Sequence, residues 1–138
     1  MYKNFIEQIV KNQVVFTLKN KKEVAVCPSA EFFVEETGEA IAVFPFWSEE
    51  TMAKSCQEDE WSDYQIEKIK LSEFMEFWCL GMYEDSVAVG INFDANLSGA
   101  EETPDQLLKD IIKEIERTNT QIKFQNFVSL NQLRNFFL

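Results

Sequence analysis

The sequence contains no histidine. Histidine titrates close to neutral pH, so it is the usual general base, the usual partner of catalytic serine and cysteine, and a common zinc ligand. Its absence therefore excludes Ser-His and Cys-His nucleophile pairs and most zinc sites.

Glycine, cysteine and long apolar runs are scarce as well. The four glycines do not cluster, so the chain has no glycine-rich phosphate loop. The three cysteines are an odd number without CxxC spacing, which indicates free thiols in a reducing compartment. No apolar run approaches the ~20 residues that cross a bilayer, and the N-terminus has the pattern of an amphipathic helix rather than a signal peptide. We therefore expect a cytoplasmic protein without a cofactor.

Acidic residues outnumber basic ones by 24 to 13, which gives a formal net charge of -11. This charge repels phosphate backbones and anionic lipids, so we expect no nucleic-acid partner and no membrane partner. The acids recur in short groups, namely Glu35-Glu36, Glu49-Glu50, Glu58-Asp59-Glu60 and Glu101-Glu102. A fold that gathers them on one side would attract a basic protein, whereas an even distribution would serve solubility.

Hydrophobic periodicity divides the chain into helices and strands. Apolar residues on one helical face predict helices over residues 2–12 and 104–115, and acids at a helix start predict a short helix over residues 49–57. The stretch 73–84 is predicted as a largely buried helix, apolar on more than one side and capped by Ser72, and Ser129 predicts a short last helix. β-branched or alternating runs predict strands over residues 14–18, 24–27, 40–46, 61–71 and 87–93. Residues 30–36, AEFFVEE, fit either a helix or a strand, and residues 121–128 alternate only weakly.

Strands partly follow one another and partly alternate with helices too short for most crossover connections. This order predicts an α+β protein, a single compact domain over residues 1–138 with a mainly antiparallel sheet of about five strands and about four helices. A doubly wound parallel sheet is the alternative. The C-terminal extension, residues 118–138, is too apolar to be left in water. We expect it to cover the sheet of its own chain, or that of a second copy in a homo-oligomer.

Several short motifs occur in a fixed order along the chain. They are Phe44-Pro45-Phe46-Trp47, Trp61-x-Asp63-Tyr64, Leu71-x-x-Phe74-x-x-x-Trp78, the run from Val89 to Asp94, and Leu97-Ser98-Gly99. In this order and spacing they resemble a bacterial family, the domain of unknown function 2750, over about residues 5–110. The resemblance implies a compact α+β domain and no particular reaction, and the C-terminal extension lies outside it.

The stretch that begins at Asp94 has the oxygen spacing of a calcium loop, with Asp105 at position twelve. A tight calcium loop ends in a glutamate that binds through both oxygens, and a helix precedes it. Here the closing residue is the shorter aspartate, Pro104 stiffens the closing turn, and a strand comes first. We interpret Asp94 as a turn former and expect no metal.

The candidate binding residues are Trp47, Trp61, Asp63, Tyr64, Asn92 and Asp94. Trp61, Asp63 and Tyr64 would form an aromatic platform beside a carboxylate. In the other interpretation Asp63 closes a turn and Trp61 packs onto the sheet. Trp47 follows a predicted strand end, where ligands are often bound, and it too is a candidate core residue. No catalytic residue stands out.

Strong acidity without any catalytic motif predicts a protein-interaction module, accessory or inhibitor-like, that binds a basic protein. The alternative is a small-molecule binding domain or an enzyme with a pocket near Trp47, Trp61, Tyr64 and Asn92. An acidic face with exposed aromatic side chains favours the first function, and a closed concavity lined by these four residues favours the second.

Overall fold

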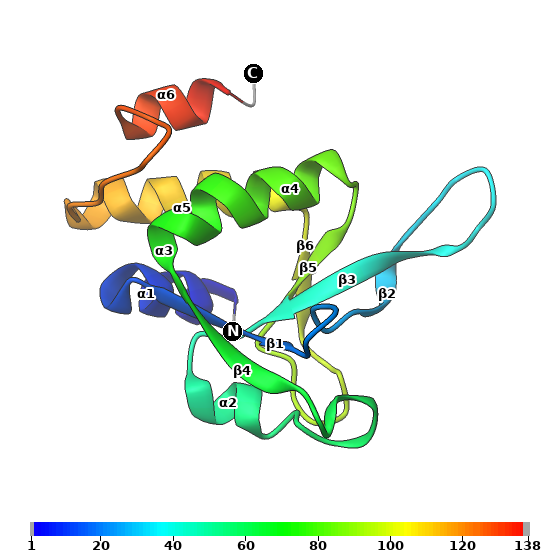
Figure 1. Ribbon diagram of the computed structural model, residues 1–138. Coiled ribbons are helices and arrows are strands. Elements are labelled where there is room, and N and C mark those ends of the chain that lie inside the picture. The colour runs from blue at the N-terminus through cyan, green and yellow to red at the C-terminus, as the bar shows by residue number, and fades with distance from the viewer. Residues whose placement is uncertain (1, 137–138) are drawn as a thin grey trace.

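The computed structural model describes residues 2–136 (Figure 1). In chain order the elements are α1 (Tyr2–Asn12), β1 (Val14–Lys19), β2 (Cys27–Phe33), β3 (Ala40–Phe46), α2 (Glu50–Lys54), the 3-10 helix η1 (Asp59–Trp61), β4 (Gln65–Lys70), α3 (Leu71–Glu73), the π-helical η2 (Phe74–Trp78), α4 (Cys79–Glu84), β5 (Ala88–Ile91), β6 (Ala100–Glu102), α5 (Pro104–Thr118) and α6 (Leu130–Asn135). This order confirms the predicted α+β class.

The strands form two sheets rather than the single sheet predicted from the sequence. β1 pairs with β4, and the larger sheet has the order β2-β3-β5-β6. Pairing is antiparallel except between β3 and β5, which are parallel. Phe16 and Trp47 join the two sheets by reciprocal backbone hydrogen bonds of 2.9 and 2.8 Å. The mainly antiparallel character is therefore confirmed, while the number of sheets was wrong.

Helices α1, α4 and α5 pack together on one side of the larger sheet (Figure 1). The helical faces predicted from apolar spacing are the buried ones, since α1 buries Phe5 and Ile9 and α5 buries Leu107 and Ile111. These side chains meet Phe46 and other residues of β3 and β5 in the first core. A second apolar cluster, which includes Trp47, Trp61 and Phe93, fills the opposite face of β3 and β5. The larger sheet is thus covered on both faces.

Residues 71–84 form one helical stretch that contains the π-helical segment η2. The helix was predicted, but Ser72 is not its N-cap. The N-cap is Lys70, and Leu71 already begins the helix with its side chain buried. The backbone N–H of Leu71 donates to the carbonyl of Gln13 at 3.0 Å, so tertiary contacts place the start one residue before Ser72.

Several predicted boundaries differ from the structure. β2 runs to Phe33, so the ambiguous residues 30–33 are strand. Of the predicted strand 24–27, Val24 forms an isolated bridge with Lys19, and Cys27 is the first residue of β2. The predicted helix 49–57 is reduced to α2, and the predicted strand 61–71 becomes η1 followed by β4. The three-residue β6 was not predicted, because a strand this short carries no periodic signal.

The C-terminal segment covers helices rather than the sheet, and α6 lies beyond α5 and α4 (Figure 1). Leu133 is fully buried, and four half-buried apolar residues pack against the first core, namely Ile122, Phe124, Phe127 and Leu130. The expected cover over the sheet of its own chain was wrong, because the two apolar cores already fill both faces of β3 and β5. Residues 121–128 form no strand, whereas Ser129 does cap α6 by accepting the N–H of Gln132 at 3.2 Å. Phe137 and Leu138, part of the predicted apolar extension, lie outside the described residues.

Within residues 2–136, no helix combines the length and the apolar character that crossing a membrane requires.

Candidate functional site

Trp47 and Trp61 meet in the second core. Trp47 is fully buried and Trp61 is 5% exposed, and their rings lie edge to face with centroids 6.5 Å apart. The indole N–H of Trp47 donates to the carbonyl of Phe93 at 2.8 Å. The polar atom of Trp47 is thus used inside the chain, which is the usual arrangement for a core tryptophan.

Asn92 links the ends of the parallel strands β3 and β5. Its backbone has a positive φ of 48°, a conformation that asparagine tolerates better than most residues. The side-chain carbonyl accepts the N–H of Ser48 at 2.9 Å, and the side-chain amide donates to the Ser48 hydroxyl at 3.1 Å. The Ser48 hydroxyl donates in turn to Gln8 at 2.5 Å. Asn92 is a buried connector between β3, β5 and α1.

Tyr64 and Asp63 lie nearer the surface. Tyr64 is half-buried at the edge of the second core, and its hydroxyl donates to Glu23 at 3.1 Å. Asp63 is exposed and lines an open cleft with Lys19, Lys21 and Lys22 of the β1–β2 turn. The structure therefore gathers Trp47, Trp61 and Tyr64 in one cluster, with the two tryptophans in its interior.

Asp94 is exposed, and its carboxylate accepts the backbone N–H groups of Asn96 at 2.9 Å and Ser98 at 3.1 Å. These bonds close the turn after β5, which is the role the sequence analysis gave to Asp94. In the part of the chain that the structure describes, no group of three or more cysteine, aspartate or glutamate side chains is arranged to hold a metal ion.

Trp61 also lines an acidic surface cleft of about 360 Å³. The cleft is lined by Cys27, Pro28, Cys56, Glu58, Asp59, Glu60, Trp61, Ala95, Asn96 and Leu97. Burial, reinforced by Glu101 and Glu60, raises the pKa of the Cys27 thiol to about 11, and burial likewise raises the pKa of Cys56. Both thiols are therefore neutral at physiological pH, and thiolate nucleophiles are not available in this cleft.

A hairpin of β2 and β3 extends away from the body of the protein (Figure 1). We call residues 31–40 the acidic arm. Its tip is closed by hydrogen bonds from Val34 N–H to Glu39 at 2.8 Å and from Gly38 N–H to Val34 at 2.7 Å. Gly38 has a φ of +74°, a backbone conformation that favours glycine.

The acidic arm presents an apolar pair between carboxylates. Phe33 is 53% exposed and Val34 is 37% exposed. The exposed carboxylates of the arm belong to Glu31, Glu35, Glu36 and Glu39. Within residues 2–136, none of these four carboxylates forms an ion pair or a hydrogen bond. The acidic arm therefore presents exposed apolar side chains and unpaired carboxylates side by side.

The root of the arm is fixed by Glu101 of β6. Its carboxylate accepts the hydroxyl of Ser29 and the backbone N–H of Ala30, the latter at 2.9 Å. The Ser29 hydroxyl oxygen also accepts the N–H groups of Glu31 at 3.0 Å and Phe32 at 2.7 Å. Glu101 thus connects the two edge strands of the larger sheet and holds the start of the arm.

An apolar cleft of about 230 Å³ lies at the base of the arm, and we call it the base cleft. It is lined by Phe32, Ile41, Met82, Tyr83, Ser86, Val87, Ala88, Thr103, Pro104 and Asp105. These residues come from the β2–β3 hairpin, from the end of α4, the turn after it and the first residue of β5, and from the start of α5 with the residue before it.

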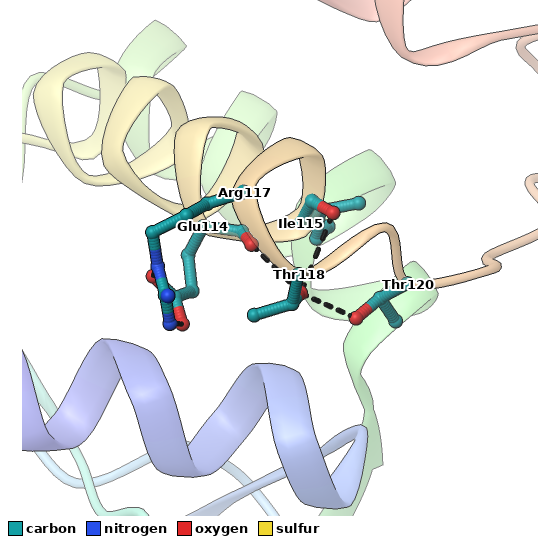
Figure 2. Close-up of polar contacts among 5 residues, drawn as sticks. All are labelled: Glu114, Ile115, Arg117, Thr118 and Thr120. Atoms are coloured by element: carbon teal, nitrogen blue, oxygen red, sulfur yellow. Dashed lines mark hydrogen bonds and ion pairs between the residues drawn. The ribbon is translucent and has the colours of Figure 1, made fainter.

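The C-terminal end of α5 carries a polar cluster whose members bond to one another (Figure 2). Arg117 contacts both carboxylate oxygens of Glu114, at 2.9 and 2.7 Å, and this contact lowers the pKa of Glu114. Thr118 donates to the carbonyl of Glu114 at 2.8 Å, and its hydroxyl lies 2.6 Å from that of Thr120. The cluster borders a cleft between α1 and α5, but its groups satisfy one another, as expected for a helix terminus.

Glu35-Glu36 was predicted from the sequence as an acidic group, whereas Phe33 was not among the predicted binding residues. The signal was an apolar triplet, Phe32 to Val34, with an acid on each side. Its secondary structure was ambiguous, so the exposed face of Phe33 was not foreseen.

No curated protein and no solved structure matches the chain. One family profile, described as a protein of unknown function (DUF2750), matches residues 2–111. The matched range includes both sheets and the acidic arm and ends within α5, so the C-terminal segment lies beyond it. The chain belongs to the DUF2750 family.

Proposed function

We propose that this chain is a protein-interaction module, accessory or inhibitor-like, that binds a basic protein through the acidic arm. The observation that carries the proposal is the exposed pair Phe33 and Val34 among four carboxylates that pair with no base within residues 2–136. An arm that projects from the body reaches a partner before the rest of the surface does.

Charge and apolar surface have different roles in this proposal. A net charge of -11 attracts a basic protein and can raise its association rate by roughly 10- to 1000-fold at low salt. Such steering contributes speed and selectivity more than affinity. Affinity comes from burying aromatic and aliphatic anchors, and Phe33 is the exposed aromatic residue of the arm.

The burial of the sequence-selected residues also favours an interaction surface over a pocket. Trp47 and Asn92 are buried, and their polar atoms bond within the chain. They are not free to contact a ligand unless the core opens. The proposal therefore places the binding surface on the arm rather than around Trp47, Trp61, Tyr64 and Asn92.

We further propose that the protein works in a bacterial cytoplasm. Cys27, Cys56 and Cys79 are all free and buried. Free thiols are usual where glutathione and thioredoxin keep the compartment reducing. Fractionation of cells expressing the tagged chain tests this assignment, and recovery in the periplasmic fraction would contradict it.

Affinity capture tests the interaction directly. The immobilised wild-type chain, the arm variant Glu35→Lys/Glu36→Lys and the matched variant Glu58→Lys/Glu60→Lys are incubated with lysate at low and high salt. Both variants change the net charge equally, and all four positions are exposed. We expect a basic protein that the wild type and the matched variant retain at low salt and the arm variant loses. Retention by all three chains, or no basic protein at low salt, would contradict the proposal.

A further inference from the structure

We infer that the base cleft is a socket for one apolar side chain of the partner, flanked in the partner's sequence by lysine or arginine. This inference rests on the proposed function, because it assumes that a basic protein binds the arm. It adds the chemistry of the bound segment, a basic peptide with a single aliphatic or aromatic anchor.

The base cleft and the acidic arm belong to the same hairpin and share Phe32. Phe32 and Ile41 line the base cleft, and both belong to the β2–β3 hairpin. Neighbouring residues of a strand point to opposite faces, so Phe32 contributes to the cleft while Phe33 lies exposed on the other face. A partner that reaches both side chains holds the arm from its two sides.

The size of the cleft selects a side chain rather than a free metabolite. Its volume of about 230 Å³ is below the roughly 300–1,000 Å³ of typical small-molecule sites. Its walls are mainly aliphatic and aromatic. Phe32 and Ile41 of the hairpin contribute to them, together with Met82, Val87, Ala88 and Pro104. A lining of this kind excludes a charged group and fits a leucine-sized anchor.

The charges around the cleft fit a basic segment. Asp105 is part of the lining, and the exposed residues Glu84 and Asp85 lie at the C-terminal end of α4, between Tyr83 and Ser86 of the lining. The C-terminal end of a helix attracts cations. No lysine or arginine lines the base cleft as the structure describes it. An anchor with flanking basic residues therefore meets apolar walls in the cleft, the carboxylate of Asp105 in its lining, and two acidic residues adjacent in sequence to lining residues.

Two synthetic peptides test the inference with the full chain. Each is an acetylated nonapeptide with four lysines on either side of a central residue, which is leucine in one and alanine in the other. Binding is followed at low salt through the backbone amide resonances of the isotope-labelled protein. We expect the leucine peptide to bind about tenfold more tightly, since it buries several more methylene and methyl groups. We also expect it to shift the amide signals of Val87, Ala88 and Thr103.

The outcomes separate this inference from the proposed function. Equal affinity of the two peptides, with shifts confined to the acidic arm, would overturn the socket and leave the basic partner in place. No binding of either peptide at low salt would contradict both. The exposed-site variant Glu84→Lys/Asp85→Lys should weaken both peptides while the preference for leucine persists. Loss of that preference would show that charge, rather than the socket, distinguishes the peptides.

Discussion

The carboxylate of Glu76 accepts the backbone N–H of Asn126 at 2.6 Å, across 50 residues of sequence. Its second oxygen accepts the N–H of Gln125 at 3.0 Å. Glu76 belongs to the π-helical segment η2 and is 2% exposed. One buried side chain thus holds the irregular C-terminal segment, where regular backbone pairing is lacking, against the helical layer.

Glu76→Ala should lower the free energy of unfolding by about 2–4 kcal/mol, because two charge-assisted hydrogen bonds are lost together. It should also make residues 121–128 sensitive to limited proteolysis. Urea denaturation and digestion with mass spectrometry measure the two effects. Glu73→Ala, on the same helical stretch and half-exposed, is the matched control. Equal stability and equal cleavage of the two variants would show that Glu76 does not hold the segment.

Leu133→Ala should cost about 2–4 kcal/mol, the usual range for truncating a buried leucine. Leu133 belongs to α6 and is fully buried, whereas Val128 in the same C-terminal segment is 92% exposed. Val128→Ala should therefore change stability by less than about 0.5 kcal/mol. Thermal or urea unfolding measures the loss of stability of each of the two variants relative to the wild type. If both substitutions were neutral, the C-terminal segment would not be docked in solution.

The buried thiols predict a loss of stability at alkaline pH. Burial raises the pKa of Cys27 from 9.0 to about 11 in the folded chain. Its contribution to stability is therefore fully present below pH 9 and disappears as pH rises from 9 to 11. Cys27→Ala should make the fall over this window less steep, although Cys56 and Cys79 titrate in the same direction. Identical pH profiles for the two proteins would contradict this cause.

Glu101→Ala should loosen the acidic arm without unfolding the body. The substitution leaves the hydroxyl of Ser29 and the N–H of Ala30 without their acceptor. We expect faster amide hydrogen exchange at residues 29–34, while exchange at the buried strand β5 remains slow. Glu102→Ala is a suitable control, since within residues 2–136 the Glu102 carboxylate accepts hydrogen bonds only from its neighbour Thr103. Equal exchange in the two variants would remove the proposed role of Glu101.

The local apolar pattern was sufficient for two elements. α1 and β3 were predicted with the observed bounds, because Phe5 and Ile9 recur at helical spacing and the residues from Ala40 to Phe46 form one short apolar run. Pairing could not be derived in the same way. The parallel contact of β3 with β5 depends on segments far apart in sequence, and β6 is too short to carry a pattern.

For the proposed binding surface, the sequence predicted the acidic residues but not where the surface lies in the fold. Clusters of acidic residues can be read directly from a sequence, and Glu35-Glu36 was identified as one of them. Large aromatic residues are equally visible, but Trp47 and Trp61 are in the second core because residues of β1, α2 and η1 pack with that face of β3 and β5. Whether an aromatic residue is exposed depends on which elements cover it, so the exposure of Phe33 required the fold.

The association rate of the captured basic partner, measured across ionic strength, tests the central claim most directly. The wild-type chain, the arm variant Glu35→Lys/Glu36→Lys and the matched variant Glu58→Lys/Glu60→Lys are compared from low salt up to 1 M, where the Debye length is ~3 Å. We predict a steep fall in rate with salt for the wild type and the matched variant, and a slow rate with little salt dependence for the arm variant. Equal rates and equal salt dependence for the two variants would contradict the claim that the acidic arm is the binding surface.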